Sequence, residues 1–124
     1  MSPTLLAWIF LAVMGGALAC FARAFATRKD TPVHKRWGIT GTAVDLVGTV
    51  AVLVTSRVLD WHVPANDETV ALVHRTIAYV ATALVFLVAG TGMARARIHT
   101  RLWVVFLPVY TVTYLLAIWA YAPL

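Results

Sequence analysis

Long apolar runs separated by short polar segments form the main pattern along this chain. The runs cover residues 5–25, 37–59, 70–94 and 100–121. A helix of roughly 20 apolar residues crosses the hydrocarbon core of a bilayer. The pattern therefore predicts four membrane spans within one domain, residues 1–124. No basic residue precedes the first run, so we interpret it as a retained span rather than a signal peptide.

The short connections predict an all-α membrane protein, an up-down-up-down bundle of four transmembrane helices. Basic residues gather around the first and third connections, which hold Arg23, Arg28, Lys29, Lys35, Arg36, Arg95, Arg97 and Arg101. The second connection is flanked by Arg57 and Arg75 alone. Because cytoplasmic loops carry the excess of Lys and Arg, we expect the first and third connections inside and both termini outside.

Two parts of the chain resemble each other at an offset of 65 residues. His34 overlays His99, and Asp45 overlays Tyr110. Each histidine belongs to a His-X-Arg segment in a basic connection, and an apolar run follows. The pattern raises the hypothesis of a tandem repeat of two helical hairpins related by a pseudo-twofold axis along the membrane normal.

Composition agrees with this class of protein. The chain is 61% hydrophobic and 12% charged, whereas a soluble domain carries about twice that share of charge. The net charge of +5 does not indicate nucleic-acid binding, because the basic residues stand at the ends of the apolar runs. There they set the topology and meet the head groups of the lipid bilayer. A single cysteine, Cys20, excludes an internal disulfide and a Cys-based metal cluster.

Three runs carry a stripe of residues along one helical face, and in two of them small residues suit close helix packing. The stripe of the second run is His34, Gly38, Gly41, Asp45 and Gly48. That of the third run is His74, Ala78, Ala81, Ala89 and Gly92. The fourth run differs, because its stripe offers rings and hydroxyls: His99, Trp103, Phe106, Tyr110, Thr113 and Ala117. Such a face suits either aromatic packing or a planar ligand.

The candidate chemistry lies first in four histidines near the ends of the spans: His34, His62, His74 and His99. The predicted topology places His34 and His99 at the inner face and His62 and His74 at the outer face, about 30 Å apart. Neutral imidazole is the commonest metal ligand, so each pair could share a cofactor. The spacing carries no strong metal signature, and interfacial histidines without a function are the alternative.

The two pairs predict different ligands. The outer pair, His62 and His74, flanks a short turn and is the expected site for a small metal ion. The inner pair begins the second and fourth spans, which lie diagonally in such a bundle. It is the expected haem site, walled by Trp103, Phe106 and Tyr110.

Asp45 is the acidic residue inside a predicted span. A charged side chain at that depth is costly unless it is paired. We therefore predict that Asp45 is neutral at pH 7 and hydrogen-bonded to a neighbour, for which Tyr110, Thr49 and Thr42 are candidates. A proton relay, a partner for an imidazole and a cation site are the functional alternatives.

Four segments of the second half of the chain carry a resemblance to a known family. They are His-Arg-Thr-Ile-Ala from His74, Gly-Thr-Gly-Met from Gly90, Ile-His-Thr-Arg-Leu-Trp around His99 and Leu-Pro-Val-Tyr around Pro108. With the histidine positions, they resemble the CtaM/YozB-like family of small four-span membrane proteins associated with haem–copper oxidase assembly. The resemblance implies oxidase maturation, handling of haem or copper, oxidase subunits as partners and the prokaryotic inner membrane. It implies no catalysis.

Two other functions fit the same residues. One is a small bis-histidine b-type cytochrome in quinol-linked electron transfer, with the histidine pairs as axial ligands. The other is a small proton-coupled transporter, working as a homodimer through Asp45. An optical spectrum separates them, because a bis-histidine haem gives sharp Soret and α bands and a transporter gives neither.

Overall fold

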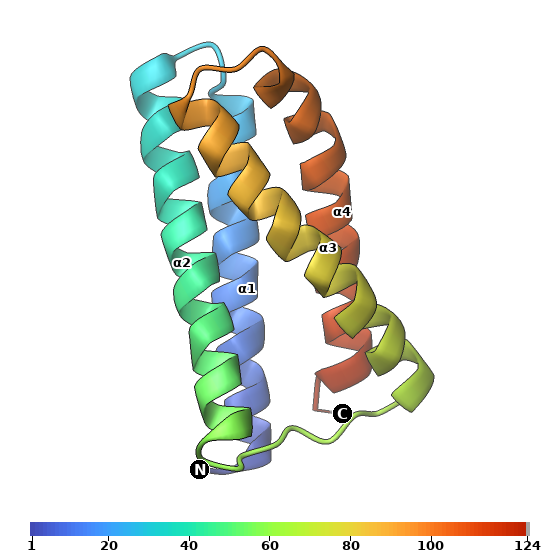
Figure 1. Ribbon diagram of the computed structural model, residues 1–124. Helices are drawn as coiled ribbons and strands as arrows, with labels where there is room; N and C mark the ends of the chain where they lie inside the picture. Colours follow the sequence, from blue (N-terminus) through green and yellow to red (C-terminus); the bar gives the residue numbers. More distant parts are fainter. Residues whose placement is uncertain (124) are drawn as a thin grey trace.

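The computed structural model describes residues 1–123, which form four helices: α1 (Pro3–Ala26), α2 (Thr31–Arg57), α3 (Glu68–Met93) and α4 (Ile98–Tyr121). Each helix is long and apolar enough to cross a membrane. The predicted all-α bundle of four transmembrane helices is therefore confirmed. Figure 1 shows the α1–α2 and α3–α4 hinges at one end of the bundle, with both termini and the central loop at the other.

Helix α2 begins at Thr31 instead of residue 37, where the sequence placed the start of the span. Asp30 caps the helix by accepting the Val33 N–H at 3.4 Å, and Pro32 fits the first turn because its missing N–H needs no partner there. His34 consequently lies in the first turn of α2. Hydropathy locates the hydrocarbon-spanning part of a helix, whereas the caps decide where the helix itself begins.

The helices pack as two hairpins. Helix α1 lies along α2, α3 lies along α4, and α1 also packs on α4. Helices α2 and α3 make few contacts, and Figure 1 shows α3 leaving α2 toward the end that carries the termini. Asn66 holds the central loop to the end of α4, because its side-chain N–H groups donate to the carbonyls of Trp119 at 3.3 Å and Ala122 at 2.8 Å.

The aromatic face predicted on α4 is the centre of the core. Trp103, Phe106 and Tyr110 are each 4% exposed or less, and Phe21 of α1 packs edge-on against all three. The Phe21 and Phe106 ring centroids are 4.8 Å apart. The sequence left two uses open for this face, aromatic packing or contact with a planar ligand. The structure shows aromatic packing, because Phe21 covers the surface that a planar ligand was expected to contact.

The glycine stripe of α2 faces α1 at two of its positions. A Cβ on Gly41 would lie 2.9 Å from the Phe21 ring, and a Cβ on Gly48 would lie 2.8 Å from Val13. The same atom on Gly38 would meet nothing within 4 Å among the described residues. Gly41 and Gly48 therefore let two backbones approach, as small residues do in membrane bundles.

We expect Gly41→Ala to lower the free energy of unfolding by about 1–3 kcal/mol relative to Gly38→Ala. The added methyl would overlap the buried Phe21 ring and would also lie 3.1 Å from Cys20 Cβ. Both variants gain helix propensity, so their difference isolates the overlap. Unfolding in mixed detergent micelles followed by circular dichroism measures it, and equal stabilities would contradict the close α1–α2 contact.

Both residue pairs related by the 65-residue offset are in contact. The His34 and His99 rings lie 5.9 Å apart, and the Tyr110 hydroxyl donates to Asp45 Oδ1 at 2.6 Å. Equivalent residues meet in this way when they lie close to a twofold axis between two hairpins. The geometry agrees with the repeat hypothesis, although α1 packs closely on α4 while its counterpart pair, α3 and α2, stays open.

Candidate functional site

His99 at the hinge end has both ring nitrogens engaged. Trp103 Nε1–H donates to His99 Nε2 at 3.0 Å, so Nε2 carries no hydrogen. Nδ1 lies 3.2 Å from Thr91 Oγ1, which itself donates to the Leu87 carbonyl at 2.6 Å, so Nδ1–H is the donor to Thr91. A bond from His99 to a haem iron would require Trp103 to give up its acceptor.

His34 has a freer ring than its neighbour His99. Its Nδ1 lies 2.6 Å from the Ala24 carbonyl, which can only accept, so Nδ1 carries the hydrogen. In the neutral imidazole Nε2 then keeps its lone pair. The structure thus brings the predicted inner pair together, with one nitrogen of His34 available and neither nitrogen of His99.

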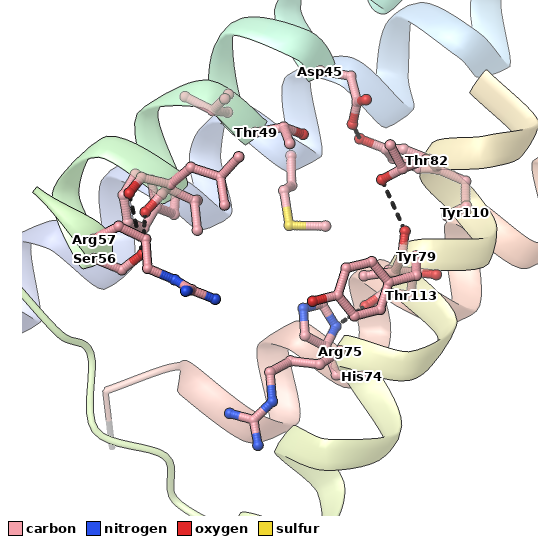
Figure 2. Close-up of a pocket in the computed structure, with 18 residues that line it drawn as sticks. Asp45, Thr49, Ser56, Arg57, His74, Arg75, Tyr79, Thr82, Tyr110 and Thr113 are labelled. Carbon is pink, nitrogen blue, oxygen red and sulfur yellow. Dashed lines mark hydrogen bonds between the residues drawn. The ribbon is translucent and has the colours of Figure 1, made fainter. Parts of the chain in front are cut away.

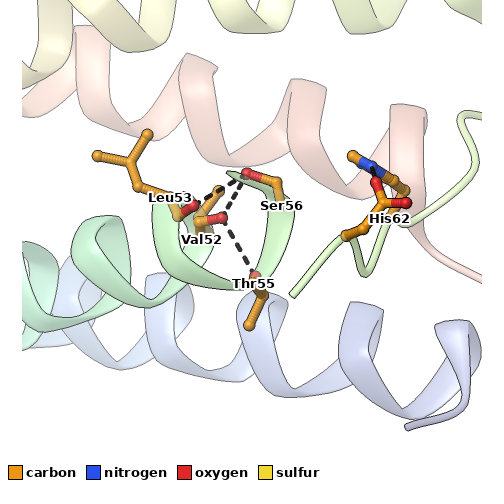
Figure 3. A network of polar contacts seen from close by, with 6 residues as sticks. Val52, Leu53, Thr55, Ser56 and His62 are labelled. Atoms are coloured by element: carbon orange, nitrogen blue, oxygen red, sulfur yellow. Dashed lines mark hydrogen bonds and ion pairs between the residues drawn. The ribbon is translucent and has the colours of Figure 1, made fainter. Parts of the chain in front are cut away.

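The predicted outer pair has separate partners. His62 lies in the central loop, with its exposed ring 2.6 Å from Asp60 Oδ1 (Figure 3). His74 lies in the second turn of α3, where its Nδ1–H donates to the Thr113 carbonyl at 3.0 Å and its ring packs edge-on against Tyr121. Within residues 1–123 the structure joins no three His, Cys, Asp or Glu side chains into a metal-holding group.

His74 instead lines a cleft of about 310 Å³ between α2 and α3 (Figure 2). The cleft exists because the two hairpins separate on this side. Its walls are mainly apolar and include Phe10, Val13, Met14, Val52, Leu53, Ala78 and Ala81. Sequence reasoning did not find this cleft. Its signal in the sequence was the pair of arginines near the ends of the second and third spans, Arg57 and Arg75. They were used there only to predict the topology.

Asp45 and Tyr110 form the deep end of the cleft. Asp45 Oδ1 accepts from the Tyr110 hydroxyl, which confirms the hydrogen bond predicted for this residue with one of its three candidate partners. Asp45 Oδ2 is shielded from solvent and has no hydrogen-bond partner among residues 1–123. A ligand reaching this depth would therefore meet one unsatisfied carboxyl oxygen.

Two arginines line the mouth of the cleft. Arg57 ends α2 and Arg75 follows His74 on α3, and Figure 2 shows Arg57 extending from α2 toward the opposite wall. Among residues 1–123, neither guanidinium has a carboxylate within 4 Å, and the ion pair found there joins His62 and Asp60 instead. From Asp45 to Arg57 the helical rise is about 18 Å. The cleft thus has a cationic mouth, apolar walls and an acid group at its end.

Comparison with family models, curated proteins and solved structures finds no match to this chain. The functional argument therefore depends on the residues and geometry described above.

Proposed function

We propose that this chain is a multi-pass protein of the prokaryotic inner membrane that assists maturation of a haem–copper terminal oxidase. It would hold haem or copper at histidine and pass it to oxidase subunits, without catalysis of its own. The four helices and the sequence resemblance around His74, His99 and Pro108 support this proposal.

The orientation of His74 is the observation that carries the proposal. Histidines that bind metals almost always donate their other ring N–H to a carbonyl or carboxylate, which fixes the tautomer and the direction of the ring. The bond from His74 Nδ1 to the Thr113 carbonyl of α4 is of this kind. It leaves Nε2 with its lone pair on a half-buried ring that lines the cleft.

Alanine replacement of each histidine tests the function. We expect His74→Ala to cause the largest loss of assembled oxidase and of bound haem or metal, and His62→Ala the smallest. The His62 ring is exposed and Asp60 is its hydrogen-bond partner among the described residues, so it serves as the matched control. Membrane levels of each variant must stay equal. Normal oxidase maturation in all four variants would return these histidines to an interfacial role.

We propose that both termini and the cleft mouth face outward, because the basic hinges belong in the cytoplasm. In a Cys20→Ser background, an impermeant thiol reagent applied to intact cells should label Ala65→Cys and spare Ala96→Cys. Label on both residues, or on Ala96→Cys alone, would refute this orientation.

Asp45 Oδ2 favours a second candidate, a proton-coupled transporter that loads and unloads a proton at this carboxyl group. A homodimer is part of that proposal. The absorption spectrum of the purified protein together with analysis of bound metal decides between the two, because a transporter of this kind carries neither haem nor copper.

A further inference from the structure

Of the two cofactors in the proposed function, the cleft between α2 and α3 fits haem better than copper. We infer that it binds a haem-type metalloporphyrin, with the two ring carboxylates held by Arg57 and Arg75 and the iron facing His74 Nε2. This inference rests on the proposed function and deepens it. It places the cofactor in the cleft instead of between His34 and His99.

The supply of donor atoms favours a porphyrin over a bare ion. Copper held by protein alone needs several side-chain ligands, and no group of three His, Cys, Asp or Glu side chains meets within residues 1–123. A porphyrin brings four nitrogen donors and needs one axial imidazole from the protein. His74 offers that single imidazole, with its Nδ1–H anchored on Thr113.

The charges along the cleft match the polarity of the same molecule. Arg57 and Arg75 come from opposite walls at the mouth, and both lack a carboxylate partner among residues 1–123. Guanidinium groups bind carboxylates through paired charge-assisted hydrogen bonds. Below them, side chains such as Val13, Val52 and Leu53 offer an apolar surface for the macrocycle.

The size and openness of the cleft are compatible with a flat ligand. Its volume of about 310 Å³ is at the small end of ligand sites. Helices α2 and α3 make few contacts beside it, so one edge of a ring could extend between them toward lipid. The aromatic wall of α4 does not offer this space, because Phe21 packs against Trp103, Phe106 and Tyr110.

The test compares ferric haem with haem dimethyl ester, which lacks the carboxylate charges, on the full-length protein in lipid nanodiscs. We expect Arg57→Gln/Arg75→Gln to weaken haem binding about tenfold or more and to leave ester binding nearly unchanged. Arg36→Gln/Arg101→Gln, at the hinge end, is the matched control and should bind both ligands normally. His74→Ala should remove the absorption bands of imidazole-bound iron with either ligand.

Several outcomes would overturn the inference: equal loss of haem and ester in Arg57→Gln/Arg75→Gln, equal loss in the control pair, or bands removed by His34→Ala instead of His74→Ala. Should His74→Ala fail to fold, His74→Gln replaces it, because the glutamine amide can still donate to the Thr113 carbonyl.

Oxidase assembly in the same variants is scored separately. Assembly that needs His74 without haem binding in the cleft would leave the proposed function intact and refute this inference. Haem binding in the cleft without any effect on assembly would support this inference and refute the proposed function.

Discussion

Phe106→Ala is expected to lower the free energy of unfolding by about 2–4 kcal/mol, the largest loss that we predict for a single core substitution. Phe106 is fully buried, and its ring contacts those of Phe21, Trp103 and Tyr110. Lipid is itself apolar, so the loss comes from the cavity and the missing dispersion contacts, with little transfer term. The helices α1 and α4 would lose the ring that joins them.

Phe86→Ala is the matched control for this prediction. Phe86 lies on α3 and is 58% exposed in the isolated bundle. Its side chain would therefore face lipid, and its removal would leave no cavity in the core. We expect its removal to change the free energy of unfolding by less than about 0.5 kcal/mol. Chemical unfolding in mixed micelles measures both variants. Equal losses would show that the Phe21–Phe106 contact does not stabilise the α1–α4 interface.

Tyr110→Phe is expected to destabilise the protein by about 1–3 kcal/mol, although it removes a single oxygen atom. The Tyr110 hydroxyl is the hydrogen-bond partner of Asp45 Oδ1, and Asp45 Oδ2 already has none among the described residues. The variant would therefore leave a carboxyl group inside the bundle without a partner at either oxygen. Asp45 would then have to draw water into the cleft or remain unsatisfied.

Asp45→Asn provides the comparison, with a loss expected below about 0.5 kcal/mol, because the amide oxygen can still accept from Tyr110. The double variant with Tyr110→Phe would give the coupling between the two groups. If Asp45→Asn alone unfolds the protein or abolishes its function, the neutral structural interpretation of Asp45 is wrong. A proton or cation role at the end of the cleft would then gain support.

Much of the fold could be predicted because a bilayer restricts what an apolar chain can do. Inside lipid, backbone polar groups must be satisfied within the segment, so each long apolar run has to become a helix. The hydrogen bond of Asp45 was predictable for a similar reason, since an unpaired carboxyl group at that depth is costly. The buried face of α4 followed from the helical spacing of Trp103, Phe106 and Tyr110.

Apart from the two arginines at the mouth of the cleft, the candidate site depended on features with no local signal. How far α3 departs from α2 is set by the crossing of two hairpins, so the cleft beside Asp45 arises only from tertiary packing. The free nitrogen of His74 depends on a carbonyl of another helix, 39 residues away in the chain. The sequence by itself determined the helices and the buried face of α4, because those follow from hydropathy and helical period. Tertiary structure decided which histidine nitrogen stays free and where a ligand could reach it, because both depend on contacts between helices distant in the chain.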